Sequence, residues 1–572
     1  MANVPSIRVE PQSFLTAPDT IELPERPPSI RSGSNRQWSP EQYTSLIAQY
    51  AKRNSTLYSG VHFTKLANLL RKPFERPNKR LISREHIPTT ESAALYTVGP
   101  GTPFEYRHIR SPEDLIECSE EDVSSMLFLR GQPCPEWLAY AGASYHIDPE
   151  FFQRHLDFLL TMSRKRYFAY PPLISASRNI IQLSYMTVGE CSSQGGDIDQ
   201  AELDDLRMSS DMDMRHYFNL MSKGISQTSS PADSIVRDYF LLDKDHFVIH
   251  QQVSVYIAQR DKGWANIIWL DTGNPLSADQ SSPWGKIIAK NQSNHQETFL
   301  PWIQTHPFAA LRATSLSITP DRRPSKDMQQ SASLLHLDYG KTLDKQLLVK
   351  DPYYALHELF TACANSNAQF LTVLASKIAQ DAARKYGPDE NVSPTNMIYY
   401  QHLLDSLASS IRNTLLSMQN RDQVSWQKAT EPTLRSKAAT AAQTLAQDYQ
   451  ELIRRTETLS EGCKTRLHVL MNRAAIVESN KAIEQAKEVT KLTRLAFVFI
   501  PLGFISSFFG MNLSPFSNNA PYGLWIFFAV SAPLVVLMLL SIIWSPRKAL
   551  LKVMRKKENR KERKSFEDEE SG

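Results

Sequence analysis

Hydrophobic residues are distributed unevenly along this chain, and the strongest signal lies near its C-terminal end. One apolar run covers residues 495–509 and a second covers 522–544, and no Asp, Glu, Lys or Arg occurs from 495 to 546. A helix that crosses a bilayer needs about 20 apolar residues, and a lone lipid-exposed strand would leave its backbone unpaired. The pattern therefore predicts a hairpin of two transmembrane helices at 495–544.

A long helical repeat precedes the first apolar run. From Leu434 to Val477, small or apolar residues recur in steps of three and four, which is typical of a helix that packs along one face. Pro432 can begin this helix, and the next proline is Pro501. A helix over 432–509 would be about 117 Å long, so it must project from the membrane as a stalk. The repeat fits packing within one chain or against copies of the chain.

The N-terminal half has short strand patterns between helical ones. The expected strands are 94–98, 104–109, 126–129, 180–188, 239–242, 247–258 and 264–270, and the expected helices are 135–143, one capped by Asp148, 353–386 and 395–424. The predicted fold class is an α+β membrane protein: an N-terminal cytoplasmic α/β domain, a long helical stalk and a C-terminal two-helix transmembrane hairpin.

These patterns divide the chain into five parts. Residues 1–90 are rich in proline, and we expect them to be largely disordered with one helix, which begins at Ser39 and Pro40. Residues 91–350 form the α/β domain with long loops, and 351–494 form a helical bundle and the stalk. The hairpin at 495–544 is followed by a basic tail at 545–572.

The charge balance and the cysteine content argue against several classes of protein. The chain has 64 basic and 60 acidic residues and a net charge of +4, which gives no reason to expect a nucleic-acid partner. Its five cysteines are scattered without a CxxC pair, so neither a disulfide framework nor a zinc knuckle is expected. The first residues lack the apolar core of a secretory signal and contain several acids, which argues against a mitochondrial presequence.

The flanks of the predicted hairpin indicate its orientation. Lysine and arginine precede the first helix and follow the second, whereas the loop at 513–521 is uncharged. The positive-inside rule places both termini in the cytosol and the loop outside, and the basic tail is suited to contact anionic lipid. We expect a multi-pass protein of the plasma membrane rather than of the vacuole or the mitochondrion.

The first predicted transmembrane helix ends in the tripeptide Gly510-Met511-Asn512. In this position, after a long charged helix and before a short loop and a last helix, the tripeptide resembles the GMN motif of the CorA family of divalent-cation channels. The resemblance extends from about residue 430 to the end of the chain. It implies a homopentamer whose GMN helix lines the pore, with candidate lining or gating positions at Ser507, Gly503, Ile500 and Leu492.

The chemistry of Mg²⁺ explains such a motif. Mg²⁺ gives up its water reluctantly, and a ring of Asn512 amides can bind the hydrated ion weakly enough to release it. Many family members follow GMN with an acidic loop, but residues 513–519 contain no acid. The expected function is magnesium uptake, with Mg²⁺ as transported ion and no cofactor. The alternatives are transport of zinc or another divalent ion, and a membrane-anchored scaffold that lost conduction.

Other candidate sites are few. We expect the polar stretch 189–233 to be a solvated acidic loop, and its residues Asp197, Asp199, Asp204 and Asp205 are weaker candidates for a regulatory divalent-ion site. Gly340-Lys341-Thr342 lacks the earlier glycine of a phosphate loop, because position 335 is Leu335. No catalytic constellation emerges, so we do not expect an enzyme.

Overall fold

The computed structural model describes residues 38–75, 93–160, 179–304, 330–510 and 525–543, with internal gaps of which the longest is 286–298. The chain divides into two compact units, one made of residues 1–383 and 399–462, the other of 384–398 and 463–572. The boundary between the two units falls inside two helices. The units therefore do not correspond to the five parts expected from the sequence, and that five-part division stays a prediction.

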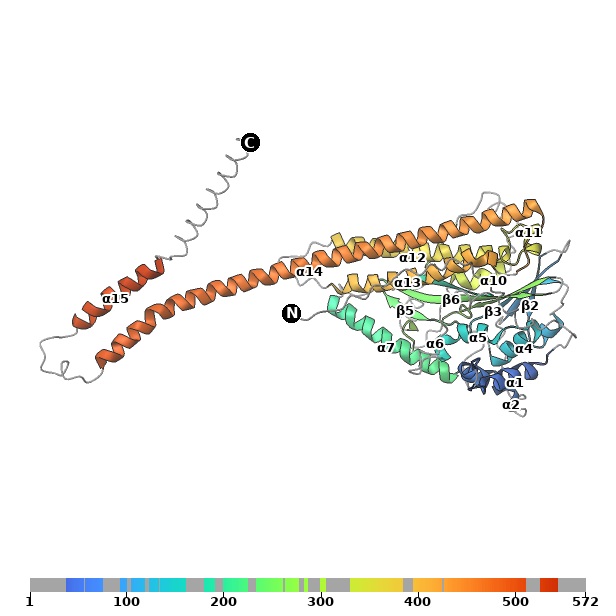
Figure 1. Ribbon diagram of the computed structural model, residues 1–572, viewed down its shortest axis with the longest axis horizontal. Coiled ribbons are helices and arrows are strands. Elements are labelled where there is room, and N and C mark those ends of the chain that lie inside the picture. Colours follow the sequence, from blue (N-terminus) through green and yellow to red (C-terminus); the bar gives the residue numbers. More distant parts are fainter. Residues whose placement is uncertain are drawn as a thin grey trace, which may run out of the picture. The chain divides into compact units, whose positions relative to one another are not determined.

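The first unit is built on a mixed sheet (Figure 1). Its strands are β1 (Ala93–Val98), β2 (Glu105–Ile109), β3 (Ser124–Arg130), β4 (Ile180–Glu190), β5 (Asp238–Leu241), β6 (His246–Gln259) and β7 (Trp264–Leu270). Their order is β2-β1-β3-β7-β6-β4, with β5 also paired to β6. All seven lie where the sequence pattern predicted strands, and no end is shifted by more than two residues.

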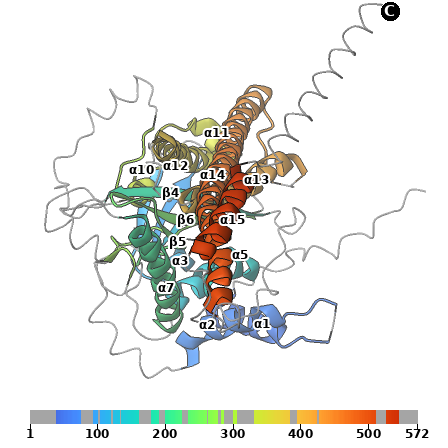
Figure 2. The same cartoon turned by 90° about the vertical axis from the view of Figure 1, so that its left-hand side faces the viewer.

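Helices cover both faces of this sheet, as Figure 2 shows from the end of the molecule. One face packs on α4 (Pro135–Tyr145) and α5 (Pro149–His155), where Phe151 and Phe152 contact Trp269 of β7. The other face is covered by α12 (His357–Ala383), whose Ser366 hydroxyl donates to the carbonyl oxygen of Met186 over 2.6 Å. Every residue of β3 and β7 is buried, as expected for strands covered on both sides.

The region before β1 contains two helices instead of the one predicted. They are α1 (Pro40–Ala51) and α2 (Thr64–Glu75). Ser39 and Gln42 form a capping box at the start of α1, as the Ser-Pro sequence indicated. The chain then turns at Gly60, where a Cβ atom would lie 2.2 Å from the Tyr50 carbonyl oxygen, and this tight turn divides the helical pattern in two. Residues 1–37 lie outside the described residues.

The expectation of a solvated acidic loop at 189–233 is wrong over most of its length. Residues Gln200–Gly224 form the helix α7. Its apolar side is buried, as Leu203, Met214 and Met221 show. Its polar side is stabilised locally, for example by Arg215 and Asp211, which are 2.7 Å apart at i,i+4 spacing. The high density of acids concealed this amphipathic repeat in the sequence.

The remaining elements are mostly helical. They are α3 (Asp114–Glu117), α6 (Asp157–Leu160), α10 (Leu335–Asp338), α11 (Lys345–Lys350), α13 (Thr395–Gln419), α14 (Pro432–Gly510) and α15 (Trp525–Ile543), with 3₁₀ turns at Val61–Phe63, Ser331–Leu334, Tyr354–Leu356 and Asn420–Gln423. The continuous α14 confirms the predicted long helix. Asp148, expected to cap α5, makes no capping bond with its side chain and instead accepts a hydrogen bond from the Tyr256 hydroxyl at 3.1 Å.

Candidate ion-conducting segment

The apolar end of α14 is the candidate membrane segment. Among the described residues, α14 is the one helix with a stretch long and apolar enough to cross a membrane. In α15 a shorter apolar stretch, Phe528–Leu537, was found, so a second crossing, and with it the hairpin, stays a prediction. The loop 513–521 and the basic tail 545–572 lie outside the described residues.

The lining positions suggested by the GMN resemblance share one face of α14. Because an α-helix turns about 100° per residue, Leu492, Ile500, Gly503, Ser507 and Gly510 fall within an arc of about 80°. All five lie in a helix that is continuous to Gly510. Met511 and Asn512, the other members of the motif, lie outside the described residues.

This face is uncovered in the single chain. The exposed fractions of Leu492 and Ile500 are 67% and 71%. Among the residues that the structure describes, a Cβ atom built on Gly503 or Gly510 would meet no heavy atom within 4 Å. Two large aliphatic side chains and two glycines on one open helix face leave room for close approach by another helix.

Pro501 lies on the other side of the same helix. It is about 180° around the axis from Leu492 and Gly510. As a proline inside α14, it has no N–H to donate to the carbonyl oxygen of Phe497, four residues earlier. The helix therefore lacks one backbone hydrogen bond on the face that points away from the candidate lining residues.

The acidic candidates for a regulatory ion site lie on α7 or just before it. Asp199 Oδ1 accepts from the backbone N–H of Gln200 at 2.6 Å. Asp204 Oδ1 accepts from the side chains of Gln200 and Arg207, at 3.0 and 3.3 Å. Asp205 is exposed, and Asp197 lies outside the described residues. Two of these carboxylates are thus engaged in local helix contacts.

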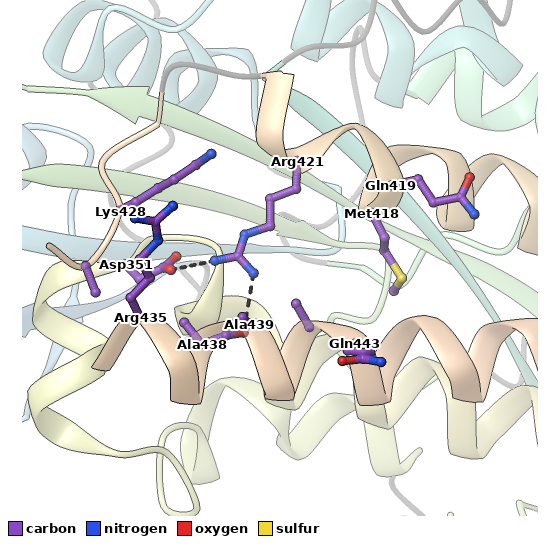
Figure 3. A pocket seen from close by; sticks show the side chains of 11 residues that line it. Asp351, Met418, Gln419, Arg421, Lys428, Arg435, Ala438, Ala439 and Gln443 are labelled. Carbon is purple, nitrogen blue, oxygen red and sulfur yellow. Dashed lines mark hydrogen bonds and ion pairs between the residues drawn. The ribbon is translucent and has the colours of Figure 1, made fainter. Parts of the chain in front are cut away.

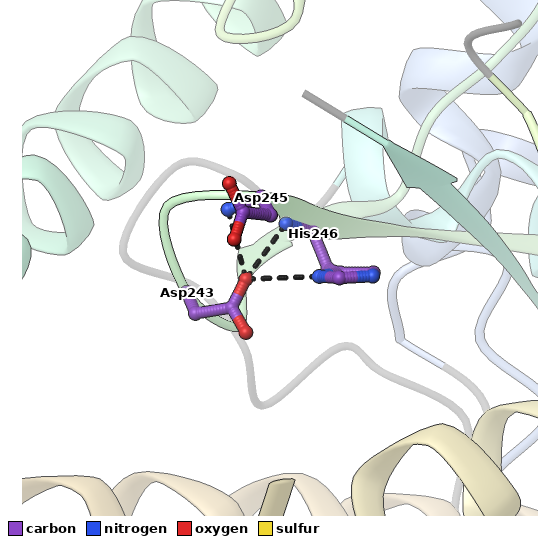
Figure 4. A group of neighbouring side chains, drawn as sticks. All are labelled: Asp243, Asp245 and His246. Carbon is purple, nitrogen blue, oxygen red and sulfur yellow. Dashed lines mark hydrogen bonds and ion pairs between the residues drawn. The ribbon is translucent and has the colours of Figure 1, made fainter. Parts of the chain in front are cut away.

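Among the described residues, one cluster brings together three potential metal ligands, and it does not include the acidic candidates of α7. Asp243, Asp245 and His246 gather in the turn between β5 and β6 (Figure 4). Asp243 Oδ1 accepts from the backbone N–H groups of Asp245 and His246, at 2.9 and 2.8 Å. Its other oxygen forms an ion pair with Lys377 of α12. Burial alone would raise the pKa of Asp243, but the bonds from His246 and Lys377 hold it well below its usual range. The Lys377 ammonium group therefore already supplies a positive charge to this turn.

The Gly340-Lys341-Thr342 loop does bind an anionic group, but one supplied by the chain itself. The Glu358 carboxylate accepts from the backbone N–H groups of Gly340 and Thr342. Gly340 has a φ of +81°, and a Cβ there would lie 2.4 Å from the Phe104 ring, so glycine is required. An internal carboxylate occupies the amides that a phosphate would need, which agrees with rejecting a phosphate loop.

A buried polar network in the first unit was missed by sequence reasoning. His155 Nδ1 lies 2.8 Å from Ser254 Oγ, and His155 Nε2 lies 3.0 Å from Asp271 Oδ1. The order serine, histidine, aspartate is that of a nucleophilic triad. However, the exposed fraction of each of these residues is 0%. Without access for a substrate, the network is structural.

The charge of this network is balanced internally. Burial lowers the pKa of His155 to about 4, so the ring is neutral near pH 7. It stacks on Trp269 at a centroid distance of 3.8 Å. Burial alone would raise the pKa of Asp271, but the nearby Arg237 guanidinium holds it below its usual range. No short-range sequence motif could reveal this network, because its members come from four separate segments of the chain.

Comparison with known proteins gives the class of the C-terminal part. Residues 338–547 match the model of the family described as CorA-like Mg²⁺ transporter protein. The resemblance expected from the GMN motif is thereby confirmed for this part of the chain, which is similar to the CorA-like Mg²⁺ transporter family. No curated protein matches the sequence.

Two solved structures are similar to the chain at low identity. One is the CorA magnesium transporter from Methanocaldococcus jannaschii, with 13% identity, a TM-score of 0.27, and coverage of 63% of this chain and 98% of that one. The other is the full-length CmaX protein, with 11% identity, a TM-score of 0.31, and coverage of 79% and 99%.

Proposed function

We propose that this chain assembles into a homo-oligomeric channel that conducts Mg²⁺ across a membrane. The observation that carries the proposal is the open face of α14. Five positions from Leu492 to Gly510 share this face within a CorA-like segment, and the last of them begins the GMN motif. A single helix face cannot enclose a pore, so several copies are required, and the family resemblance gives five.

In this channel the exit of α14 selects the ion. The Asn512 amides of the copies form a ring that hydrogen-bonds the water around Mg²⁺ without removing it. Gly510 and Gly503, whose surroundings are open in the single chain, allow the helices to approach closely. Leu492 and Ile500 form apolar constrictions that close the pore by dewetting.

The membrane part is a hairpin of α14 and α15 with both termini in the cytosol. The basic residues on both sides of the two apolar runs favour this orientation. The basic tail then contacts anionic lipid of the inner leaflet. Flux is passive, because a doubly charged ion gains about 4.6 kcal/mol per 100 mV of inside-negative potential.

The test is ion flux in liposomes that contain the purified full-length protein. Entry of Mg²⁺ is followed with an enclosed dye and compared with Zn²⁺, Ni²⁺ and Co²⁺. We expect potential-driven Mg²⁺ entry that exceeds entry into protein-free liposomes. Preferred entry of Zn²⁺ would make zinc the transported ion. If correctly oriented oligomers pass none of these ions, the protein is a membrane-anchored scaffold instead.

A further inference from the structure

A cavity of about 370 Å³ lies in the first unit, where the chain passes from the end of α13 to the start of α14 (Figure 3). It is remote in sequence from the candidate membrane segment and has no part in the function proposed above. A single inorganic anion would leave most of this volume empty, since cavities of 300–1,000 Å³ typically accept small organic ligands.

The cavity exists because one face of α14 carries small side chains at this point. Arg435, Ala438, Ala439 and Ala442 all line it, and their spacing of three and four residues places them on one side of the helix. Ala438 is buried, whereas Arg435 and Ala439 are exposed. Alanine at these positions leaves a shallow apolar wall, with a guanidinium at one end.

Positive charge dominates the lining. Arg421, Lys428 and Arg435 are the cations and Asp351 is the one carboxylate among the residues that line the cavity. Figure 3 shows Arg421 and Arg435 close to Asp351. Asp351 Oδ2 accepts from Arg421 at 2.8 Å, and its Oδ1 accepts from the backbone N–H groups of Tyr353 and Tyr354, both at 3.0 Å. Both carboxylate oxygens thus already accept hydrogen bonds from the chain, and the Arg421 guanidinium balances the charge of Asp351.

Arg421 is held in place at the wall of the cavity. Its guanidinium also lies over the Tyr353 ring at 4.8 Å, and its side chain is 12% exposed. Its Nε atom is buried and has no hydrogen-bond partner among the described residues. Arginine is well suited to phosphate, because its planar fork can offer two parallel N–H donors.

From these observations we propose that the cavity binds a phosphorylated small molecule of nucleotide size. Its phosphate contacts Arg435 and Lys428 at the charged end, and its organic part lies on the alanine wall of α14. A negative charge there is also favoured by the N-terminal end of α14, which begins at Pro432. The proposal concerns binding alone and requires no bond to form or break.

The experiment measures binding to the full-length protein in detergent, in the presence of EDTA. AMP, ATP, inorganic phosphate and adenosine are titrated calorimetrically. We expect binding of a nucleotide, with inorganic phosphate and adenosine each binding at least tenfold more weakly. Arg435→Gln should weaken nucleotide binding by about tenfold or more, the effect of losing one charge-assisted contact.

Two further variants distinguish the cavity from general surface charge. Ala439→Leu keeps a good helix former and places a bulkier side chain on the cavity wall, so it should weaken nucleotide binding at least tenfold without lowering the melting temperature. Arg454→Gln removes the same charge from an exposed part of α14, where its partner is Glu451, and should leave binding unchanged. Absence of nucleotide binding, or equal binding by Arg435→Gln, Ala439→Leu and the wild type, would overturn the proposal. Since ion flux is not the readout, the result is independent of the channel function.

Discussion

Arg237 and Asp271 form a two-point ion pair in the interior of the first unit. Arg237 Nε lies 2.6 Å from Asp271 Oδ2, and a terminal nitrogen lies 3.1 Å from Oδ1. The Arg237 side chain is 9% exposed and that of Asp271 is fully buried. The pair holds the segment before β5 against the end of β7, so its loss should affect the whole unit.

The first prediction concerns Asp271→Asn. The substitution leaves Arg237 buried without its counter-charge, and breaking a buried pair costs about 3–5 kcal/mol. We expect a clear drop in the melting temperature of the purified protein. Asp211→Asn is the control, because Asp211 and Arg215 are exposed and such a pair contributes about 1 kcal/mol or less. Equal melting temperatures for the two variants would contradict the structural role of the pair.

The second prediction is a pH dependence that originates at His155. Burial lowers the pKa of His155 from its ordinary 6.5 to about 4 in the folded protein. Between these values the unfolded state binds the proton and the folded state does not, so stability rises with pH over this window and is lost as the pH falls. The loss from this residue can reach about 3 kcal/mol. Melting temperatures should fall from pH 6.5 to pH 4, with a shallower slope in His155→Gln. An unchanged slope in the variant would assign the dependence to other groups.

The third prediction uses three glycines of the same helix. In the described part of the chain, no heavy atom lies within 4 Å of a Cβ built on Gly462, Gly503 or Gly510. Alanine should therefore be tolerated by the single chain and should favour the helix by about 0.5–1 kcal/mol. If copies of α14 approach at its C-terminal end, Gly503→Ala and Gly510→Ala should reduce Mg²⁺ flux severalfold. Gly462→Ala, outside the apolar segment, should leave flux unchanged. Equal flux in all three variants would argue against close helix contacts at 503 and 510.

The fourth prediction concerns Asn512. Asn512→Ala removes the proposed ring of hydrogen-bonding amides, so flux should fall at least tenfold while the protein still purifies as an oligomer. Asn512→Asp adds a ring of charge, which should tighten binding of Mg²⁺ at the pore mouth and lower the maximal flux. Dye-based flux in liposomes checks both variants. Wild-type flux in Asn512→Ala would remove Asn512 from the selectivity role without excluding a channel.

The fifth prediction tests the orientation of the membrane part. A cysteine introduced at Asn518, in the uncharged loop, should react with a membrane-impermeant maleimide in intact cells. A cysteine at Ser571, in the basic tail region, should react only after permeabilisation. Labelling of Ser571→Cys in intact cells would exclude a hairpin with both ends in the cytosol.

The sequence predicted local structure well wherever apolar residues repeated clearly. The strand 264–270 and the long helix from Pro432 were located from such repeats, and the structure has them at Trp264–Leu270 and Pro432–Gly510. The helix α7 was missed because its few apolar residues, such as Leu203 and Met214, are separated by many acids.

Features that depend on distant segments could not be predicted. His155, Ser254 and Asp271 meet only after the sheet has formed, and each is unremarkable in its own stretch of sequence. Ala438 belongs to the repeat that predicted a packing face, but the structure shows that it lines a cavity together with Ala439 and Ala442. A spacing rule identifies a helix face, whereas the neighbouring elements decide whether that face is filled or hollow.

The parallel pairing of β3 with β7 also determines when, during synthesis of the chain, the sheet can be completed. The Trp264 backbone N–H donates to the Ser124 hydroxyl across 140 residues of sequence, and β3 pairs in parallel with β7 from Ser125 and Ala265 onward. At about 5–20 residues per second, a ribosome needs on the order of 10 s to make the intervening chain. During that interval β1, β2 and β3 can pair with one another, but one edge of β3 stays open to aggregation. The sheet can close only after β7 has emerged, and this is still well before the apolar end of α14 is synthesised.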